Sequence, residues 1–175
     1  MSKIKKIVLS AMFLAMLIVI SRFLSINLQL LTIGFAFVPI MLSALYLGPK
    51  YSAMIAALGD LMGALLFPFG PYFPGFTISA GITGLIYGLF LYRKPEKKMS
   101  NKKLILFLTI SSAVVLGFSS VLLNSLFLHV LYGKAFVALL ATRVVKDLVM
   151  LPIQVIVIFI LHKLLHPVIK KYLCE

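Results

Sequence analysis

The sequence predicts an all-α, polytopic membrane protein with six transmembrane helices, and three observations support that prediction. Hydrophobic residues make up 62% of the 175-residue chain, and its mean hydropathy is +1.14. Charged residues make up only 12%, against roughly 25% in ordinary soluble proteins. The apolar residues gather in six runs, most of them long enough for a helix that crosses a bilayer. We therefore expect a single integral-membrane domain that covers residues 1–175.

The six runs are separated by charged residues or by segments rich in glycine and proline. They cover residues 4–24, 34–47, 51–69, 76–92, 104–131 and 136–165. The first run follows the basic start MSKIKK, as in a signal peptide, but no small-residue cleavage site precedes Arg22. We therefore expect it to be retained as the first helix. The second run is short, whereas the last two are long enough to tilt or to project from the bilayer.

Basic residues predict how these helices are oriented. All but four of the 17 Lys and Arg residues lie near the two ends of the chain or in the loops after the second and fourth helices. Because Lys and Arg collect on the cytoplasmic side of membranes, both termini should be cytoplasmic. This distribution also accounts for the net charge of +13. We expect no nucleic-acid partner, because the basic residues flank apolar runs and form no patch with interleaved aromatics.

The segment between the third and fourth helices indicates a ligand site. Residues 67–76, FPFGPYFPGF, carry no charge and are rich in proline, glycine and aromatic residues. Such a loop is stiff and poorly suited to free solvation, as a lid over a site would be. The preceding helix carries Asp60 near mid-membrane, where an acid must face protein or water. We favour a structural role for Asp60 over a ligand contact.

Four cations lie where topology does not explain them: Arg22, Lys134, Arg143 and Lys146. Arg143 lies roughly 10 Å beyond the start of the last helix, too deep in the membrane for bulk water to solvate its charge readily. Arg143, Lys146 and Asp147 share one helical face, so Arg143 can pair with Asp147 and leave Lys146 free. A structural ion pair is the alternative, but we favour a pocket for an anionic ligand.

Other polar residues fall toward the same, non-cytoplasmic end of the helices. Arg22 lies at the end of the first helix. There its side chain either contacts a ligand or extends so that its charge reaches the membrane–water interface. Asn124 and His129 in the fifth helix have the chemistry to hydrogen-bond a heteroaromatic ligand, or alternatively a neighbouring carbonyl inside the bundle. All three are kept as candidate ligand contacts.

Small residues spaced four apart predict close helix contacts. Gly84 and Gly88 are expected to pack inside the protein, because lipid offers no hydrophobic drive and small residues let helices approach. Ala11 and Ala15 form a similar stripe on the first helix, which has few polar side chains of its own. We expect that stripe to accept another subunit.

Motifs for catalysis or metal binding are missing from the sequence. It contains no G-x-x-x-x-G-K-[ST], H-E-x-x-H or G-x-S-x-G. A single cysteine, Cys174, allows neither a cysteine metal cluster nor a disulfide within the chain. We expect no enzymatic activity, no catalytic residues, no metal and no cofactor in this chain.

Several segments together resemble the S components, the substrate-binding subunits, of energy-coupling factor (ECF) vitamin transporters. These are LLFPFGPYFPGFTISAGITGLIYG at 65–88, the stripe of Ala11 and Ala15, the six short spans and the basic fourth loop. The resemblance covers essentially the whole chain. Within the family, FPFGPYFPGFT and LLATRVVKDLVMLPIQ at 139–154 are most similar to the folate-specific members. It implies a bacterial plasma-membrane protein that binds folate tightly from outside. It also implies delivery with a T component and two ATPases, which would consume the ATP.

Folate adds a chemical expectation for the site, because it carries two carboxylates and a flat pterin ring with many donors and acceptors. Such a ligand requires cations, aromatic faces and amide-like groups. The expected contacts are Arg143 and Lys146 near anionic or acceptor groups, Phe69, Tyr72 and Phe73 on ring faces, and Asn124 or His129 on ring edges, with Arg22 nearby. The sequence leaves open which end of folate enters first.

Three alternatives remain at this stage. The first is an S component for another vitamin, such as pantothenate or thiamin. The second is a stand-alone small-solute carrier that uses Asp60, Arg143 and Asp147 as a relay. The third is a structural membrane subunit that binds no small molecule.

Overall fold

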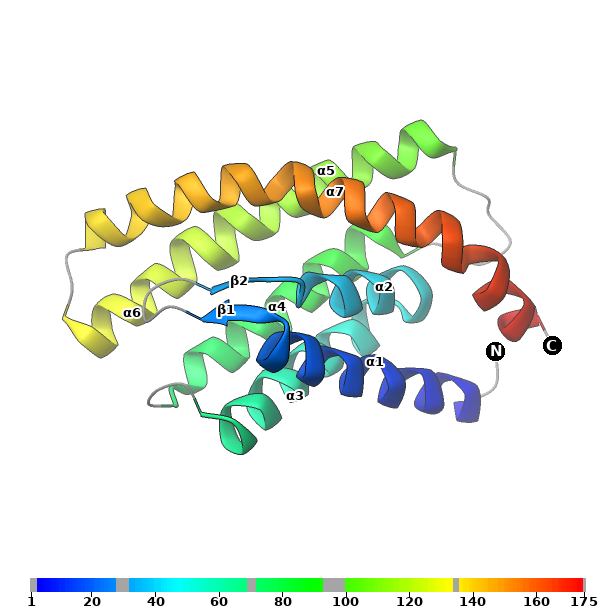
Figure 1. Ribbon diagram of the computed structural model, residues 1–175, viewed down its shortest axis with the longest axis horizontal. Helices are drawn as coiled ribbons and strands as arrows, with labels where there is room; N and C mark the ends of the chain where they lie inside the picture. The colour runs from blue at the N-terminus through cyan, green and yellow to red at the C-terminus, as the bar shows by residue number, and fades with distance from the viewer. Residues whose placement is uncertain (1–2, 28–31, 69–71, 93–99, 134–135, 175) are drawn as a thin grey trace.

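A computed structural model describes residues 3–27, 32–68, 72–92, 100–133 and 136–174. In this part of the chain, long helices lie side by side in one elongated bundle (Figure 1). They are α1 (Lys3–Phe23), α2 (Phe37–Leu47), α3 (Pro49–Leu66), α4 (Pro74–Leu91), α5 (Asn101–Val115), the π-helix η1 (Leu116–Leu123), α6 (Asn124–Tyr132) and α7 (Phe136–Cys174). Because α5, η1 and α6 follow one another without a break, the described ranges form six helical rods. The start of α1 and the end of α7 lie at one end of the bundle, which we call the terminal end.

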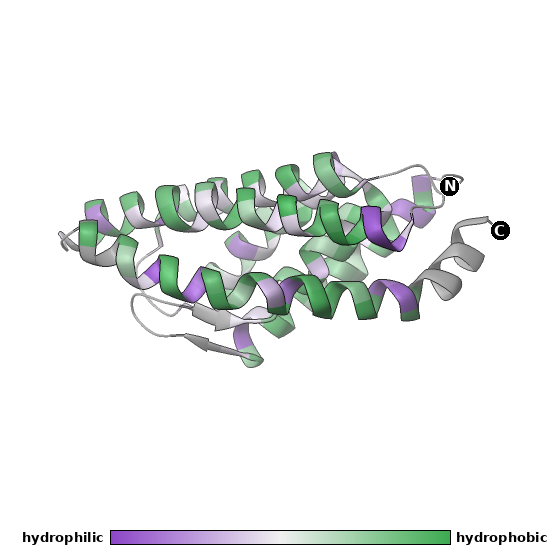
Figure 2. Ribbon diagram, turned by 90° about the horizontal axis from the view of Figure 1, so that it is seen from above, coloured by the Kyte–Doolittle hydropathy of each residue, from purple (hydrophilic) through white to green (hydrophobic). Residues whose placement is uncertain are grey.

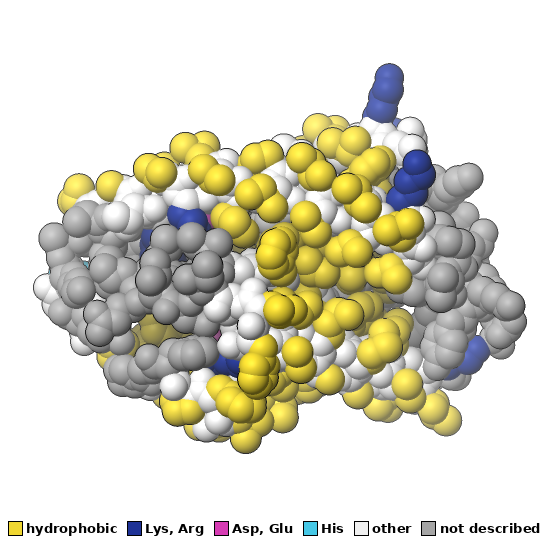
Figure 3. All heavy atoms as spheres, in the orientation of Figure 1, with side chains coloured by type: hydrophobic (Ala, Val, Ile, Leu, Met, Phe, Trp, Pro, Cys, Tyr) yellow, Lys and Arg dark blue, Asp and Glu magenta, His cyan; other side chains and the backbone are white. Residues whose placement is uncertain are grey.

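The helices have the length and surface of a membrane protein. Four segments are long and apolar enough to cross a bilayer: Lys3–Phe23, Pro74–Leu91, Asn101–Leu131 and Leu140–Leu165. Along the ribbons, hydrophobic residues predominate (Figure 2). Hydrophobic side chains cover the middle of the molecule, and Lys and Arg side chains lie toward its ends (Figure 3). Such a belt suits hydrocarbon and not water. The expected helical membrane fold is therefore confirmed.

A short β-hairpin follows α1, although the sequence predicted no strands. Strand β1 (Ser25–Asn27) pairs antiparallel with β2 (Thr32–Gly34), and Ser25 lies opposite Gly34. A β-carbon at position 34 would overlap the side chain of Ser25, so this close pairing requires glycine. The expected start of the second helix at residue 34 was therefore wrong, because α2 begins only at Phe37.

Two further helix ends differ from the expected ones. Helix α3 ends at Leu66 instead of residue 69, and Phe67 is extended, with φ −136° and ψ 71°. Pro68 explains this end, because a proline disfavours helical geometry in the residue before it. Helix α7 continues to Cys174, beyond the expected end at residue 165. Hydropathy marks the part of a helix that lipid surrounds, whereas the helix itself can continue into water.

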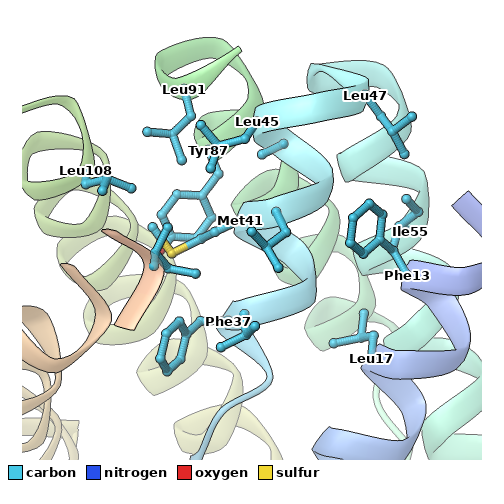
Figure 4. Packing of buried hydrophobic residues seen from close by; sticks show 14 of the residues in the cluster. Phe13, Leu17, Phe37, Met41, Leu45, Leu47, Ile55, Tyr87, Leu91 and Leu108 are labelled. Carbon is cyan, nitrogen blue, oxygen red and sulfur yellow. The ribbon is translucent and has the colours of Figure 1, made fainter. Parts of the chain in front are cut away.

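The short helix α2 lies in the core. Nearly all of its residues are buried, including Met41, Leu42 and Ala44, which are almost completely inaccessible. Helices α1, α3, α4 and α7 pack against it, and the core around it includes Phe13 and Tyr87 (Figure 4). The all-round apolar character of α2 fits a helix that is buried on every side.

Helices α3 and α4 approach closely through the small residues expected from the sequence. A β-carbon at Gly84 would overlap the backbone of Ser52, and one at Gly88 would overlap Pro49. The Ser52 hydroxyl donates a hydrogen bond to the Gly84 carbonyl at 2.6 Å. The prediction that these glycines form internal contacts is confirmed.

Candidate ligand-binding site

A partly open cavity of about 260 Å³ lies between the helices. Its walls come from the end of β2, from α2 and α4, from the rod formed by α5, η1 and α6, and from α7. Phe37, Ile40 and Met150 supply apolar surface. The lining residues with polar side chains are Thr83, Tyr87, Ser119, Ser120, Asn124, Lys146, Asp147 and Gln154. An apolar pocket with a few converging polar groups is typical of a small-molecule site.

The π-helix η1 forms one wall of this cavity through Ser119 and Ser120. Arg143 lies behind this wall and is only 8% exposed. Its Nη1 donates a hydrogen bond to the Ser120 carbonyl at 3.1 Å. Because π-helical turns displace backbone carbonyls and are frequent at functional sites, this segment distinguishes the wall from an ordinary helix. Arg143 therefore braces the backbone of the cavity wall from outside.

Asp147 and Lys146 form an ion pair at the cavity. The Lys146 Nζ lies 3.1 Å from the Asp147 Oδ1, and the two side chains are 16% and 5% exposed. The expectation that Lys146 is left free was therefore wrong. That expectation considered residues three and four apart on the helix, whereas the long lysine chain reaches the carboxylate of its immediate neighbour. The cavity thus contains a compensated charge pair.

Buried polar atoms in the lining lack hydrogen-bond partners among the described residues. They are the Ser119 Oγ, the Asn124 Oδ1 and the Asp147 Oδ2, whereas the Asp147 Oδ1 faces the Lys146 ammonium. A buried polar group left unsatisfied costs about 1–3 kcal/mol. A carboxylate only accepts hydrogen bonds, and so does an amide oxygen. The cavity is therefore arranged to receive the hydrogen-bond donors of a ligand.

A second polar cluster joins α1, α3 and α4 away from the cavity. The Thr77 hydroxyl donates to the Asp60 Oδ2 at 2.8 Å, and the Tyr72 hydroxyl lies 3.1 Å from the Thr77 Oγ1. Arg22 donates from Nη1 to the Phe67 carbonyl at 3.0 Å, just after the end of α3. Arg22 and Tyr72, both expected near the ligand, do not line the cavity. Asp60 holds α4 against α3, as a structural role requires.

Aromatic rings connect the start of α4 with α6. The Phe73 ring centroid lies 5.4 Å from that of Phe127 and 6.0 Å from that of Phe76. Phe73 does not line the cavity, and neither does the exposed His129. Phe69 lies outside the described residues. Of the expected ligand contacts, the structure brings Asn124 and Lys146 together at the cavity, with Arg143 directly behind its wall.

The lining includes residues that sequence reasoning did not select. Gln154 follows Asp147 by about two helical turns, so the two share a face of α7. The sequence could have indicated Gln154, because it is a polar residue in an apolar run at that spacing from Asp147. Nothing in the sequence indicated Ser119, because serine is common in membrane helices and its presence does not show whether it faces a cavity.

The small-residue stripe of α1 lies on its outer face. Ala11 and Ala15 are exposed beside Val8 and Met12, whereas the opposite face buries residues such as Phe13. The stripe therefore does not pack inside this chain.

Comparison with known proteins agrees with this architecture. A family model described as "ECF-type riboflavin transporter, S component" matches residues 1–171. This chain belongs to the S components of ECF-type transporters. The family resemblance seen in the sequence is confirmed.

Relatives of this S component are named as folate transporters. The folate transporter FolT of Clostridium novyi is 38% identical over 159 residues, which cover 91% of this chain and 88% of the relative. FolT of Leuconostoc mesenteroides is 35% identical, with 86% and 80% covered. A crystal structure of FolT bound with folic acid matches with a TM-score of 0.79 and 33% identity, covering 90% of this chain and 92% of that one.

Proposed function

We propose that this S component binds folate and serves as the substrate-binding subunit of an ECF-type importer. The observation that carries the proposal is the partly open cavity, whose lining presents unsatisfied acceptor atoms of Asp147 and Asn124. Folate matches them, because its pterin ring has an amino group and a ring N–H on one edge. The FolT relatives and the likeness to FolT bound with folic acid support the same ligand.

The acceptor oxygens of Asp147 and Asn124 favour one orientation of folate. The glutamate end carries two carboxylates, which only accept hydrogen bonds, whereas the pterin edge offers the donors that these oxygens require. The cavity of about 260 Å³ is also slightly smaller than the roughly 300–1,000 Å³ of typical ligand pockets. We therefore place the pterin in the cavity and the glutamate end beyond it.

Riboflavin is the second candidate ligand, because the family model carries its name. Its fused ring system also presents an N–H between two carbonyl groups. Folate is preferred because FolT relatives align over most of both chains. The match to the family model identifies the chain as an S component and does not decide which vitamin it binds.

The remaining features of the assembly follow from the family and from charge. We place the protein in a bacterial plasma membrane with both termini in the cytoplasm, because most Lys and Arg residues then face inward. A T component would dock on α1 at Ala11 and Ala15, and two ATPases would hydrolyse ATP. This chain itself would carry no cofactor and catalyse no reaction.

Reconstitution tests this function against a stand-alone carrier. Liposomes that contain this chain alone should bind labelled folate without accumulating it, with or without ATP. Liposomes that also contain the T component and both ATPases should accumulate folate when ATP is enclosed with the ATPases. Accumulation by the chain alone would identify a stand-alone carrier, and failure of the complete assembly to bind folate would rule out the proposed ligand.

A further inference from the structure

One hydrogen bond joins two residues of the cavity lining, on the side of the cavity that is nearest the terminal end. The Tyr87 hydroxyl donates to the Gln154 Oε1 at 3.2 Å and so joins α4 to α7. Both residues line the cavity, and they are only 1% and 5% exposed. The Tyr87 ring belongs to the core cluster with Met41 and Leu91 (Figure 4). The position of its hydroxyl is therefore fixed by packing.

This bond determines which way the Gln154 amide faces. A glutamine amide has one acceptor oxygen and an NH₂ group with two donors. Because Tyr87 occupies the oxygen, the Nε2 is left to donate into the cavity. Without the tyrosine hydroxyl, the amide could turn over and present its oxygen instead.

Gln154 and Asp147 are placed to contact the same part of a ligand. They lie about two turns apart on one face of α7. Long side chains on a helix lean toward its N-terminus, so Gln154 leans toward Asp147. Asp147 accepts hydrogen bonds, and the Gln154 Nε2 donates one. The two side chains therefore form a pattern of acceptor followed by donor.

We propose that Tyr87 is a positioning residue that fixes the Gln154 amide as a donor, and that this pair selects ligands by an acceptor on the ring edge. The inference rests on folate as the proposed ligand. The pterin ring places a carbonyl oxygen, at ring position 4, beside its N–H and amino donors. Asp147 accepts hydrogen bonds from these donors, and the Gln154 Nε2 donates one to the carbonyl oxygen.

The test compares folate with its 4-amino-4-deoxy analogue, in which an amino donor replaces that carbonyl acceptor and the neighbouring ring N–H becomes an acceptor nitrogen. Titration calorimetry in detergent gives both dissociation constants. The wild-type chain should prefer folate by roughly a hundredfold or more, because the analogue mismatches two buried hydrogen bonds, one to Gln154 and one to Asp147, each worth roughly tenfold. Tyr87→Phe should lower this ratio roughly tenfold, because the amide is then free to turn and accept from the amino group, while Asp147 still prefers the ring N–H of folate. Gln154→Glu should lower it at least as far, because an ionised carboxylate only accepts hydrogen bonds.

Tyr46→Phe is the matched control. The Tyr46 hydroxyl lies 3.1 Å from the His162 Nδ1 and also ties another helix, α2, to α7, but neither residue lines the cavity. This variant should keep the wild-type ratio. Thermal unfolding of each variant without ligand separates loss of stability from loss of selectivity.

The outcomes separate this inference from the proposed function. If the wild-type chain binds folate but Tyr87→Phe leaves the ratio unchanged, the positioning role is wrong. An equal loss of affinity for both ligands, together with lower stability, would also overturn it, because Tyr87 would then be only structural. If the wild-type chain binds neither ligand, the proposed function itself fails.

Discussion

Asp147→Ala is expected to weaken folate binding at least about a hundredfold. The side chain is 5% exposed, and apart from the Lys146 ammonium at its Oδ1 it has no hydrogen-bond donor among the described residues, so a bound pterin would supply further donors. A hydrogen bond to a charged group contributes about 1.5–3 kcal/mol. Two such bonds therefore exceed about 2.7 kcal/mol, the energy of a hundredfold change. The dissociation constant for folate, measured by calorimetry, checks this prediction.

Asp60→Asn is the matched control for Asp147. It also alters a membrane-embedded acid, but asparagine retains an oxygen that can accept from Thr77. Folate affinity should stay close to wild type. A comparable loss in both variants would mean that Asp147 contributes only to folding.

A double variant tests whether the ion pair is merely structural. Asp147→Ala leaves the Lys146 ammonium without its partner in a poorly solvated site, which is costly in itself. Lys146→Met combined with Asp147→Ala removes both charges and should recover stability but not folate affinity. Recovery of affinity as well would refute the proposed contact between Asp147 and the ligand.

Ala11→Trp and Ala15→Trp are expected to abolish most folate uptake while folate affinity stays close to wild type. Both alanines lie on the exposed face of α1, remote from the cavity lining. A bulky ring there would prevent another helix from approaching, because such contacts depend on small residues. Uptake is measured in the liposomes that contain the T component and both ATPases, and affinity is measured on the isolated chain.

Ala113→Trp supplies the control for bulk on the membrane surface. Ala113 is also exposed, but it lies on α5. We expect normal uptake from this variant. If the α1 variants lose binding and uptake together, the substitutions disturb the fold of the chain, and the docking role is contradicted. If they retain uptake, the stripe faces only lipid.

The sequence predicted those features that depend on composition and local pattern. Long apolar runs indicated the helices, because few charged groups are tolerated in hydrocarbon. Gly84 and Gly88 indicated a close helix contact inside the protein, because their spacing alone places them on one face, and the structure shows that the partner is α3. Asn124 and Lys146 were selected as rare polar groups in apolar segments, and both line the cavity.

Features that depend on contacts between distant segments escaped sequence reasoning. The β-hairpin pairs residues across a loop and has only three residues in each strand, too few for a visible alternation. The π-helix η1 continues α5 into α6, and no residue type in it signals a π-helix. The bond of Tyr87 to Gln154 joins residues 67 positions apart. Only a structure brings that pair together.

Calorimetric titration of the purified chain with folate, and in parallel with riboflavin, tests the central claim most directly. The experiment is done in detergent without nucleotide or partner subunits. Folate should give saturable heat at an equimolar ratio, because the cavity and its acceptor atoms belong to this chain alone. Riboflavin should give none. Saturable binding of riboflavin, with no heat and no thermal stabilisation from folate, would contradict the account.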